Sequence, residues 1–137
     1  MATGCFDILH KGHLSYLSQA KRYGDYLVVV VARDKTIQRE KHRTPHLDEK
    51  TRIKALQKIP LVDKAILGSL TDKLATLLKI RPDVLAIGYD QNINEEELQN
   101  YFEKNRLHVK IIRMKQHRPN IYKSSIFRAK HEHAKKV

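Results

Sequence analysis

The run at residues 26–32, Tyr-Leu-Val-Val-Val-Val-Ala, is apolar and rich in β-branched side chains, with no polar face. A strand of this kind must be covered on both sides, as strands in a parallel sheet are. Shorter runs of the same type follow at 64–67, 83–87 and 107–112, and residues 1–3 read as a very short opening strand. The chain is therefore expected to build a parallel sheet that is buried on both faces.

Helical patterns separate these apolar runs. Residues 13–23 and 50–59 carry apolar side chains at helical spacing. Thr71 is expected to cap a third helix, and Asn94 a fourth, whose first turn holds three glutamates, the charge that the helix dipole favours. A last helix is expected to begin at the Ser124–Ser125 pair.

The alternation of strand and helix predicts an α/β fold: a doubly wound, Rossmann-like, five-stranded parallel sheet with helices on both faces. In such sheets a ligand binds outside the carboxyl ends of the strands, near the point where the strand order reverses. Residues suited to ligand contact follow the predicted strands at that edge, namely 4–7, 33–35, 68–69 and 88–91.

The length of 137 residues indicates one domain, which can bury roughly two-thirds of the surface that the unfolded chain exposes. Cys5 is the single cysteine, so no disulfide forms within the chain, and a lone thiol fits a reducing compartment. No apolar run approaches the ~18 residues that span a bilayer. A cytoplasmic protein without a membrane partner is expected.

Positive charge is concentrated in one part of the chain. Residues 1–103 have 16 basic and 14 acidic side chains, a net charge of +2, whereas residues 104–137 have 11 basic side chains and one acidic, a net charge of +10. This basic C-terminal segment could neutralise nucleic-acid phosphates or attract small polyanions such as nucleotides. A solvated basic helix is an equally good interpretation of the charge alone.

The most informative motif is TGCFDILHKGH at residues 3–13, which joins a strand end to a helix start. Gly4 lets the backbone approach a ligand closely, and the helix, expected to open near Gly12, directs free N–H groups and a positive dipole end outward. His10 and His13 lie three residues apart, so both rings are expected to face one pocket. Two imidazoles beside a helix N-terminus suit a polyphosphate and the charge that develops during phosphoryl transfer.

Zinc is the competing interpretation of the histidine pair. A zinc site normally needs a third protein ligand, and the nearby thiol of Cys5 belongs to a strand-to-loop turn. No metal site made by the protein's own side chains is therefore expected.

The segment TGCFDILHKGH resembles the G-x-F-D-x-x-H-x-G-H signature of the small nucleotidyltransferases, the cytidylyltransferase-like group. Later landmarks occur in the same order as in that family. Lys41 and Arg43 lie where the family holds basic residues over the triphosphate, in an expected loop, and Arg52 lies where it has another basic residue in the following helix. Residues 88–91, Gly-Tyr-Asp-Gln, resemble its nucleoside-binding turn, and Ser124–Ser125 its phosphate-holding helix start.

Within the family, the fragments VVVVARDKT, VDKAILGSLTDK and AIGYDQ are most similar to archaeal members that join ATP and FMN into FAD. This resemblance implies transfer of AMP to the FMN phosphate, with pyrophosphate released and a divalent cation bridging the phosphates. The alternative is a CTP-dependent enzyme acting on glycerol 3-phosphate or a sugar phosphate. Its Arg-Thr-Glu-Gly-Ile-Ser segment is replaced here by residues 118–123, Arg-Pro-Asn-Ile-Tyr-Lys, which weakens the cytidine interpretation.

The resemblance and the motif together assign the candidate site. His10, His13 and Lys41 are the catalytic candidates. Asp90 is expected to hold the ribose or base. The residues expected to bind the nucleotide are Thr3, Gly4, Cys5, Phe6, His10, His13, Arg43, Gly88, Asp90, Ser124 and Ser125.

Three motif residues have competing interpretations. An aspartate in a turn more often bonds its own backbone, so a structural role is favoured for Asp7. Cys5 is expected to be a small packed side chain, with redox sensitivity as the alternative. Lys11 either contacts phosphate or points to solvent.

Two other function classes remain open. A nucleic-acid-binding module would use the basic segment, although that segment lacks the interleaved aromatic residues of a single-strand binder. A nucleotide sensor would keep the pocket without turnover. The family resemblance also implies a possible homodimer.

Overall fold

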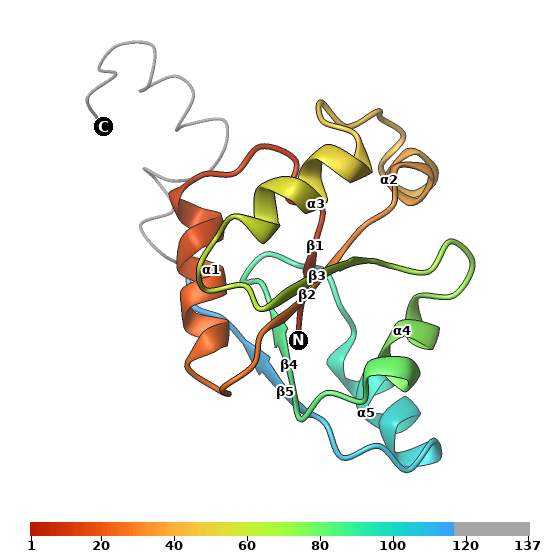
Figure 1. The fold of residues 1–137 in the computed structure, drawn as a ribbon. Coiled ribbons are helices and arrows are strands. Elements are labelled where there is room, and N and C mark those ends of the chain that lie inside the picture. The colour runs from red at the N-terminus through yellow and green to blue at the C-terminus, as the bar shows by residue number, and fades with distance from the viewer. Residues whose placement is uncertain (117–137) are drawn as a thin grey trace.

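The computed structural model describes residues 1–116. These residues form a five-stranded sheet in the order β3-β2-β1-β4-β5, with every neighbouring pair parallel (Figure 1). The expected doubly wound α/β fold is confirmed. The strands are β1 (Ala2–Gly4), β2 (Val28–Val31), β3 (Lys64–Leu67), β4 (Val84–Ile87) and β5 (Lys110–Arg113).

Helices connect the strands and cover both faces of the sheet (Figure 1). Asn94 caps the fourth predicted helix as expected, accepting a hydrogen bond from the backbone N–H of Glu97 at 3.0 Å. The helices are α1 (Lys11–Lys21), α2 (Asp34–Lys41), α3 (Glu49–Gln57), α4 (Lys73–Ile80) and α5 (Glu95–Lys104).

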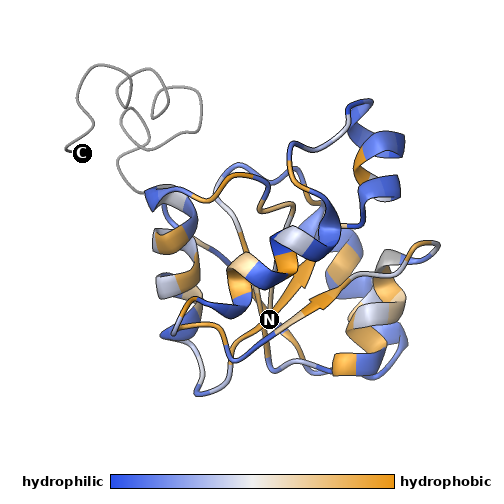
Figure 2. Ribbon diagram, turned by 45° about the horizontal axis from the view of Figure 1, so that its top comes forward, coloured by the Kyte–Doolittle hydropathy of each residue, from blue (hydrophilic) through white to orange (hydrophobic). Residues whose placement is uncertain are grey.

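Two hydrophobic clusters hold the layers together, one on each face of the sheet. Successive side chains of a strand point to opposite faces, and β4 shows this directly: Ala86 belongs to one cluster, Leu85 and Ile87 to the other. Leu17 of α1 joins the first cluster and Phe102 of α5 the second. Figure 2 shows the strongest hydrophobic colouring on the central strands, as the valine-rich run predicts.

The sheet places β1 at its centre, and this sets the position of the site. The chain moves from β1 to β2 and β3 on one side, then crosses to β4 and β5 on the other. β1 and β4 share a single register pair, Ala2 with Ala86, whereas β1 and β2 share three. Pairing between β1 and β4 therefore stops before their carboxyl ends, the edge at which a doubly wound sheet binds its ligand.

Several element predictions were wrong in detail. Asp72, not Thr71, caps α4, and its carboxylate accepts from the N–H of Leu74 at 2.9 Å. The second strand is shorter than expected because the N–H of Leu27 turns to the carboxylate of Asp63, 2.6 Å away. Tyr26, expected inside that strand, is 60% exposed.

The helix α2 was not predicted at all. Its sequence, Asp-Lys-Thr-Ile-Gln-Arg-Glu-Lys, is almost entirely polar and shows no apolar stripe, yet Thr36 and Ile37 are buried. Lys41, expected in a loop, is the last residue of this helix. The final helix expected at Ser124–Ser125 lies outside the described residues. Within residues 1–116, none of the helices has the length and apolar character needed to cross a membrane.

Candidate functional site

The turn after β1 brings a phenylalanine ring back over the strand end. Phe6 has a φ of 51°, a left-handed conformation that non-glycine residues rarely adopt, and its side chain is only 3% exposed. A Cβ placed on Gly4 would lie 2.9 Å from Cε2 of that ring. Gly4 therefore makes room for the ring of Phe6. The sequence had suggested that Gly4 lets the backbone approach a ligand, whereas the group that approaches it in the structure is a side chain of the same motif.

His10 is the N-cap of α1, so the helix begins one residue before the expected Gly12. The Nδ1 atom of His10 accepts a hydrogen bond from the N–H of Gly12 at 3.0 Å. In return, Nδ1 of His13 accepts from the N–H of His10 at 3.3 Å. This reciprocal capping box holds the two ring centroids 4.0 Å apart. The predicted pairing of the two imidazoles at a helix N-terminus is what the structure shows.

The capping bonds also determine which ring nitrogen carries the proton. Because Nδ1 of each histidine accepts a hydrogen bond, each neutral ring must carry its proton on Nε2. Burial lowers the pKa of His10 below its ordinary value. Burial and the neighbouring His10 lower the pKa of His13 to about 4. At neutral pH the pair therefore supplies two polar Nε2–H donors, while positive charge has to come from elsewhere.

Asp7 anchors the segment that follows α2. Its carboxylate oxygens accept hydrogen bonds from the backbone N–H groups of His46 and Leu47, each at 2.9 Å, and Arg43 lies 3.5 Å away. Burial would raise the pKa of this carboxyl, but the hydrogen bonds with His46 and Leu47 outweigh it and lower the pKa. The structural role expected for Asp7 is supported, although its partners are a distant segment and not its own turn.

Lys41 reaches the motif from the end of α2. Its Nζ donates to the sulfur of Cys5 at 3.2 Å, so a lysine amine lies beside the loop between β1 and α1. The thiol of Cys5 is half-buried. Lys41 and Arg43, two candidates that sequence placed far from the motif, thus both contact residues within it.

Arg52 is buried beneath the candidate site residues and is not exposed to a ligand. Its side chain is fully buried, and Nη1 donates to the carbonyls of Cys5 and Ala32, each at 2.7 Å. Nη2 donates to Asp34 at 2.7 Å. Arg52 lies where the family has a basic residue, but in this structure it is a buried side chain that links the ends of β1 and β2 to the start of α2.

The turn at residues 88–91 lies at the same edge of the sheet, after β4. Gln91 folds back so that its Oε1 accepts from the N–H of Gly88 at 2.7 Å, while its Nε2 donates to the carbonyl of Thr3 at 3.1 Å. A Cβ on Gly88 would lie 3.3 Å from Cγ of Gln91, a tight contact, so the glycine leaves room for this fold-back. The side chain of Asp90 is exposed.

Two residues of this edge were missed by the sequence interpretation. Tyr16, three residues after His13 on the same helix face, donates its hydroxyl to the carbonyl of Ala86 at 2.7 Å and accepts from the N–H of Thr3 at 3.1 Å. Burial raises the pKa of this tyrosine. Arg113 contacts the 88–91 turn from β5. The i, i+3 spacing could have found Tyr16, whereas no local signal points to Arg113.

The structure thus gathers Thr3, Gly4, Cys5, Phe6, His10, His13, Lys41, Arg43, Gly88 and Asp90 on loops and element ends at the carboxyl edge of the sheet. Ser124 and Ser125 lie outside the described residues. Among residues 1–116, no group of three or more His, Cys, Asp or Glu side chains is placed to hold a metal ion.

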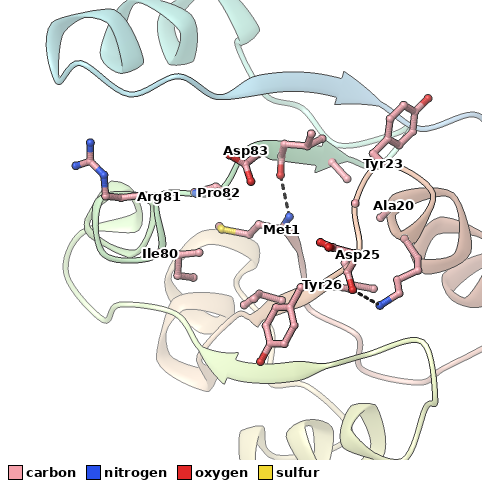
Figure 3. Close-up of a pocket in the computed structure, with 15 residues that line it drawn as sticks. Met1, Ala20, Tyr23, Asp25, Tyr26, Ile80, Arg81, Pro82 and Asp83 are labelled. Atoms are coloured by element: carbon pink, nitrogen blue, oxygen red, sulfur yellow. Dashed lines mark hydrogen bonds between the residues drawn. The ribbon is translucent and has the colours of Figure 1, made fainter.

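A cavity of about 320 Å³ lies at the opposite end of the sheet (Figure 3). It is lined at the amino ends of the central strands by Met1, Asp25, Tyr26, Pro82 and Asp83 among others. Because ligands of doubly wound sheets bind at the carboxyl ends, this cavity is separate from the candidate site.

Comparison with known proteins shows the family of this chain. A family model described as cytidylyltransferase-like matches residues 1–130. The FAD synthase of Thermoplasma volcanium is 44% identical over 130 residues, which cover 95% of this chain and 91% of that protein. The FAD synthase of Methanohalophilus mahii is 43% identical over 114 residues, 83% of this chain and 79% of that protein.

Solved structures give the same fold. A lipopolysaccharide core biosynthesis protein from Thermoplasma volcanium is 45% identical, with a TM-score of 0.82 over 85% of this chain and 95% of its own. Pantothenate synthetase from Thermus thermophilus is 15% identical, with a TM-score of 0.56 over 90% of this chain and 58% of its own, and supports the fold alone. From its motif, its sheet and these matches, the chain belongs to the cytidylyltransferase-like family.

Proposed function

We propose that this protein transfers AMP from ATP to the phosphate of FMN, forming FAD and releasing pyrophosphate. The observation that carries the chemistry is the pair of neutral histidines that cap α1 beside the strand-order reversal. The choice of ATP and FMN is supported by relatives named FAD synthase, with identities of 43% and 44% over most of both chains.

The reaction needs no nucleophile from the protein. An ionised oxygen of the FMN phosphate attacks the α-phosphorus of ATP and forms the new P–O bond. The bond between the α-phosphorus and the bridging oxygen breaks, and pyrophosphate leaves with that electron pair. Catalysis is then a matter of alignment and of stabilising negative charge in the transition state.

The histidines suit that task because they donate without carrying charge. Each ring has Nε2–H as its donor, and the N-terminus of α1 adds a positive dipole end. Donors already held in place by the capping box stabilise developing charge on the phosphorus and on the departing pyrophosphate without reorganising. His10 and His13 are therefore proposed as the residues that contact the reacting phosphates.

Positive charge comes from the α2 side of the site. The contacts of Lys41 with Cys5 and of Arg43 with Asp7 place both cations beside the motif, where they would neutralise the β- and γ-phosphates. The backbone of residues 3–6 would complete this part of the site. Gly88 and Asp90 would hold the nucleoside, and Ser124 and Ser125, outside the described residues, would add to the phosphate cradle.

A divalent cation is expected to accompany the nucleotide. Residues 1–116 offer no cluster of their own for it, and both oxygens of the Asp7 carboxylate already accept backbone hydrogen bonds. Mg²⁺ commonly binds through substrate phosphates and retained waters. The cation would lower the charge on the triphosphate and is assigned here to the substrate.

A pyrophosphate-release assay tests the substrate assignment. ATP and CTP are each combined with FMN, glycerol 3-phosphate and a sugar phosphate, the last because a solved relative is named for lipopolysaccharide core biosynthesis. We expect release with ATP and FMN, together with FAD detected by chromatography. Release only with CTP would replace the proposed substrates but keep the chemistry. No release with any pair would support a nucleotide sensor.

Two substitutions test the histidines while keeping the caps. Asparagine at position 10 retains an N-cap acceptor, and glutamine at position 13 suits the third helical position of a capping box. His10→Asn and His13→Gln are each expected to lower kcat by about 10²- to 10³-fold. Nucleotide affinity should change far less.

His108→Asn is the matched control, because His108 is exposed just before β5. It should leave both kcat and nucleotide affinity unchanged. If the substitutions at positions 10 and 13 weakened nucleotide binding and left kcat intact, the catalytic assignment would be wrong.

A further inference from the structure

The guanidinium of Arg113 contacts the turn at residues 88–91 from the β5 side. Its Nη1 donates to the carbonyl of Gly88 at 3.0 Å and to the carbonyl of Gln91 at 2.8 Å. Its Nε and Nη2 point to one carboxylate oxygen of Glu95, at 3.3 and 3.1 Å. One side chain therefore ties both ends of the turn to the first residue of α5.

This contact follows from the register of the sheet. Arg113 is the last residue of β5 and lies opposite Ile87, the last residue of β4. The turn leaves β4 at that level, so an arginine at this register position can reach the turn carbonyls. Its planar, rigid fork can serve the turn carbonyls and Glu95 together, which a lysine ammonium cannot do in the same geometry.

The same turn is also hydrogen-bonded to the motif at residues 3–13. Gln91 spans from the N–H of Gly88 to the carbonyl of Thr3, and Thr3 immediately precedes Gly4 in the motif strand. Tyr16 adds a second link between β1 and β4 through its hydroxyl. The turn is thus held between β5 on one side and β1 on the other.

We infer that Arg113 is a positioning residue for nucleoside recognition: it fixes the 88–91 turn beside the carboxyl ends of β1 and β4. The backbone and side chains that would meet the base and ribose are then held in place before the nucleotide arrives. Affinity rises when such groups need not be ordered on binding. This inference rests on the proposed function and identifies a residue that the assigned site does not include.

Nucleotide titration separates this role from a general structural one. ATP would contact both the phosphate-binding residues and the 88–91 turn. Inorganic tripolyphosphate would contact only the phosphate-binding residues, namely the histidine pair with Lys41 and Arg43. Arg113→Gln is expected to weaken ATP binding about tenfold or more, as loss of charge-assisted hydrogen bonds would, while tripolyphosphate affinity stays within about twofold. In the enzyme assay, KM for ATP should rise while kcat changes by less than about threefold.

Two further variants complete the experiment. Lys110→Gln removes one positive charge from the same strand at an exposed position, and should leave both affinities unchanged. Arg113→Lys keeps the charge but not the fork, and should recover only part of the ATP affinity. It also carries the test if Arg113→Gln does not fold.

The outcomes distinguish the two proposals. Wild-type protein that binds ATP, with an Arg113→Gln variant that binds it equally well, would overturn the role of Arg113 alone. Equal weakening of ATP and tripolyphosphate would also overturn it, because the effect would then be general. A wild-type protein that fails to bind ATP would overturn the proposed function and the role of Arg113 with it.

Discussion

The absence of a side chain at Gly4 determines how the motif at residues 3–13 packs. The ring of Phe6 occupies the space where a Cβ would stand, and the centroid of that ring lies 5.6 Å from the ring centroid of His13. A change at Gly4 is therefore transmitted to a candidate catalytic residue through one buried phenylalanine.

Gly4→Ala is expected to destabilise the protein by about 1–3 kcal/mol, the usual cost of forcing an extra methyl into a packed region. It should also lower the rate of pyrophosphate release, because Phe6 and then His13 must shift. Urea denaturation and the coupled assay measure both effects. Gly24→Ala is the matched control, since nothing lies within 4 Å of its added Cβ. Equal behaviour of the two variants would contradict the steric account.

His13 gives a pH dependence at the same scale. Its pKa is about 4 in the folded protein and 6.5 ordinarily, so the folded state disfavours the charged ring. The unfolded chain takes up this proton first as pH falls, and the free energy of unfolding should therefore decrease between the ordinary and the folded pKa. The decrease due to this one group is no more than about 3 kcal/mol.

The measurement compares wild type with His13→Gln in urea at about pH 7.5 and about pH 4.5, on either side of the ordinary pKa. Wild type is expected to lose more stability on acidification than the variant, because only wild type contains the buried imidazole. Titrating groups outside the histidine pair are common to both proteins and cancel in the difference, so the difference reports on the pair, in which His13 has the larger pKa shift. An equal loss in both would mean that His13 titrates normally.

At the scale of elements, α3 is held to the sheet by a charge that it buries. Arg52 connects the carbonyls at the ends of β1 and β2, and its Nη2 donates to the carboxylate of Asp34 at the start of α2. A fully buried guanidinium needs partners for its donors, and each nitrogen of this one donates at least one hydrogen bond. Arg52 therefore helps to hold the loop between β1 and α1 in place, through the carbonyl of Cys5.

Arg52→Met is expected to cost about 3–5 kcal/mol, because it removes the buried cation that pairs with Asp34 and donates to the part-buried carbonyls of Cys5 and Ala32. Thermal or urea unfolding measures this loss. Lys54→Met makes the same chemical change at an exposed position of α3 and should stay within about 0.5 kcal/mol of wild type. A similar small effect at both positions would show that the buried contacts of Arg52 contribute little.

The same elements show what local pattern can predict. The strand at Lys64–Leu67 and the cap at Asn94 were found because a short apolar run and an Asn-Glu-Glu-Glu start carry their own signal. The helix α2 was not found, because its polar sequence shows no apolar stripe, although Thr36 and Ile37 are buried in the folded protein. Lys41 was therefore assigned to a loop. Its position over a triphosphate stays a prediction, and the structure adds its contact with Cys5.

For the whole molecule, the position of the site follows from strand order. With β1 central and β2 and β4 on either side of it, the loops after β1 and β4 meet at one edge. The motif at residues 3–13 comes from one of these loops, and the 88–91 turn comes from the other. The α2–α3 connection adds Arg43, which lies 3.5 Å from Asp7. Three parts of the chain that are distant in sequence therefore contribute to the candidate site.

Local chemistry in the chain was enough to predict the parallel sheet and the helix start at the two histidines, and it suggested a phosphate ligand for that start, which stays a prediction. These features depend on neighbours a few residues apart, and the side-chain period and capping rules describe such neighbours well. Only the tertiary structure showed three other features: the burial of Arg52, the left-handed backbone at Phe6 and the hydrogen bonds of Arg113 with the 88–91 turn. Each depends on strand register and on packing between residues distant in the chain, which no short stretch of sequence specifies.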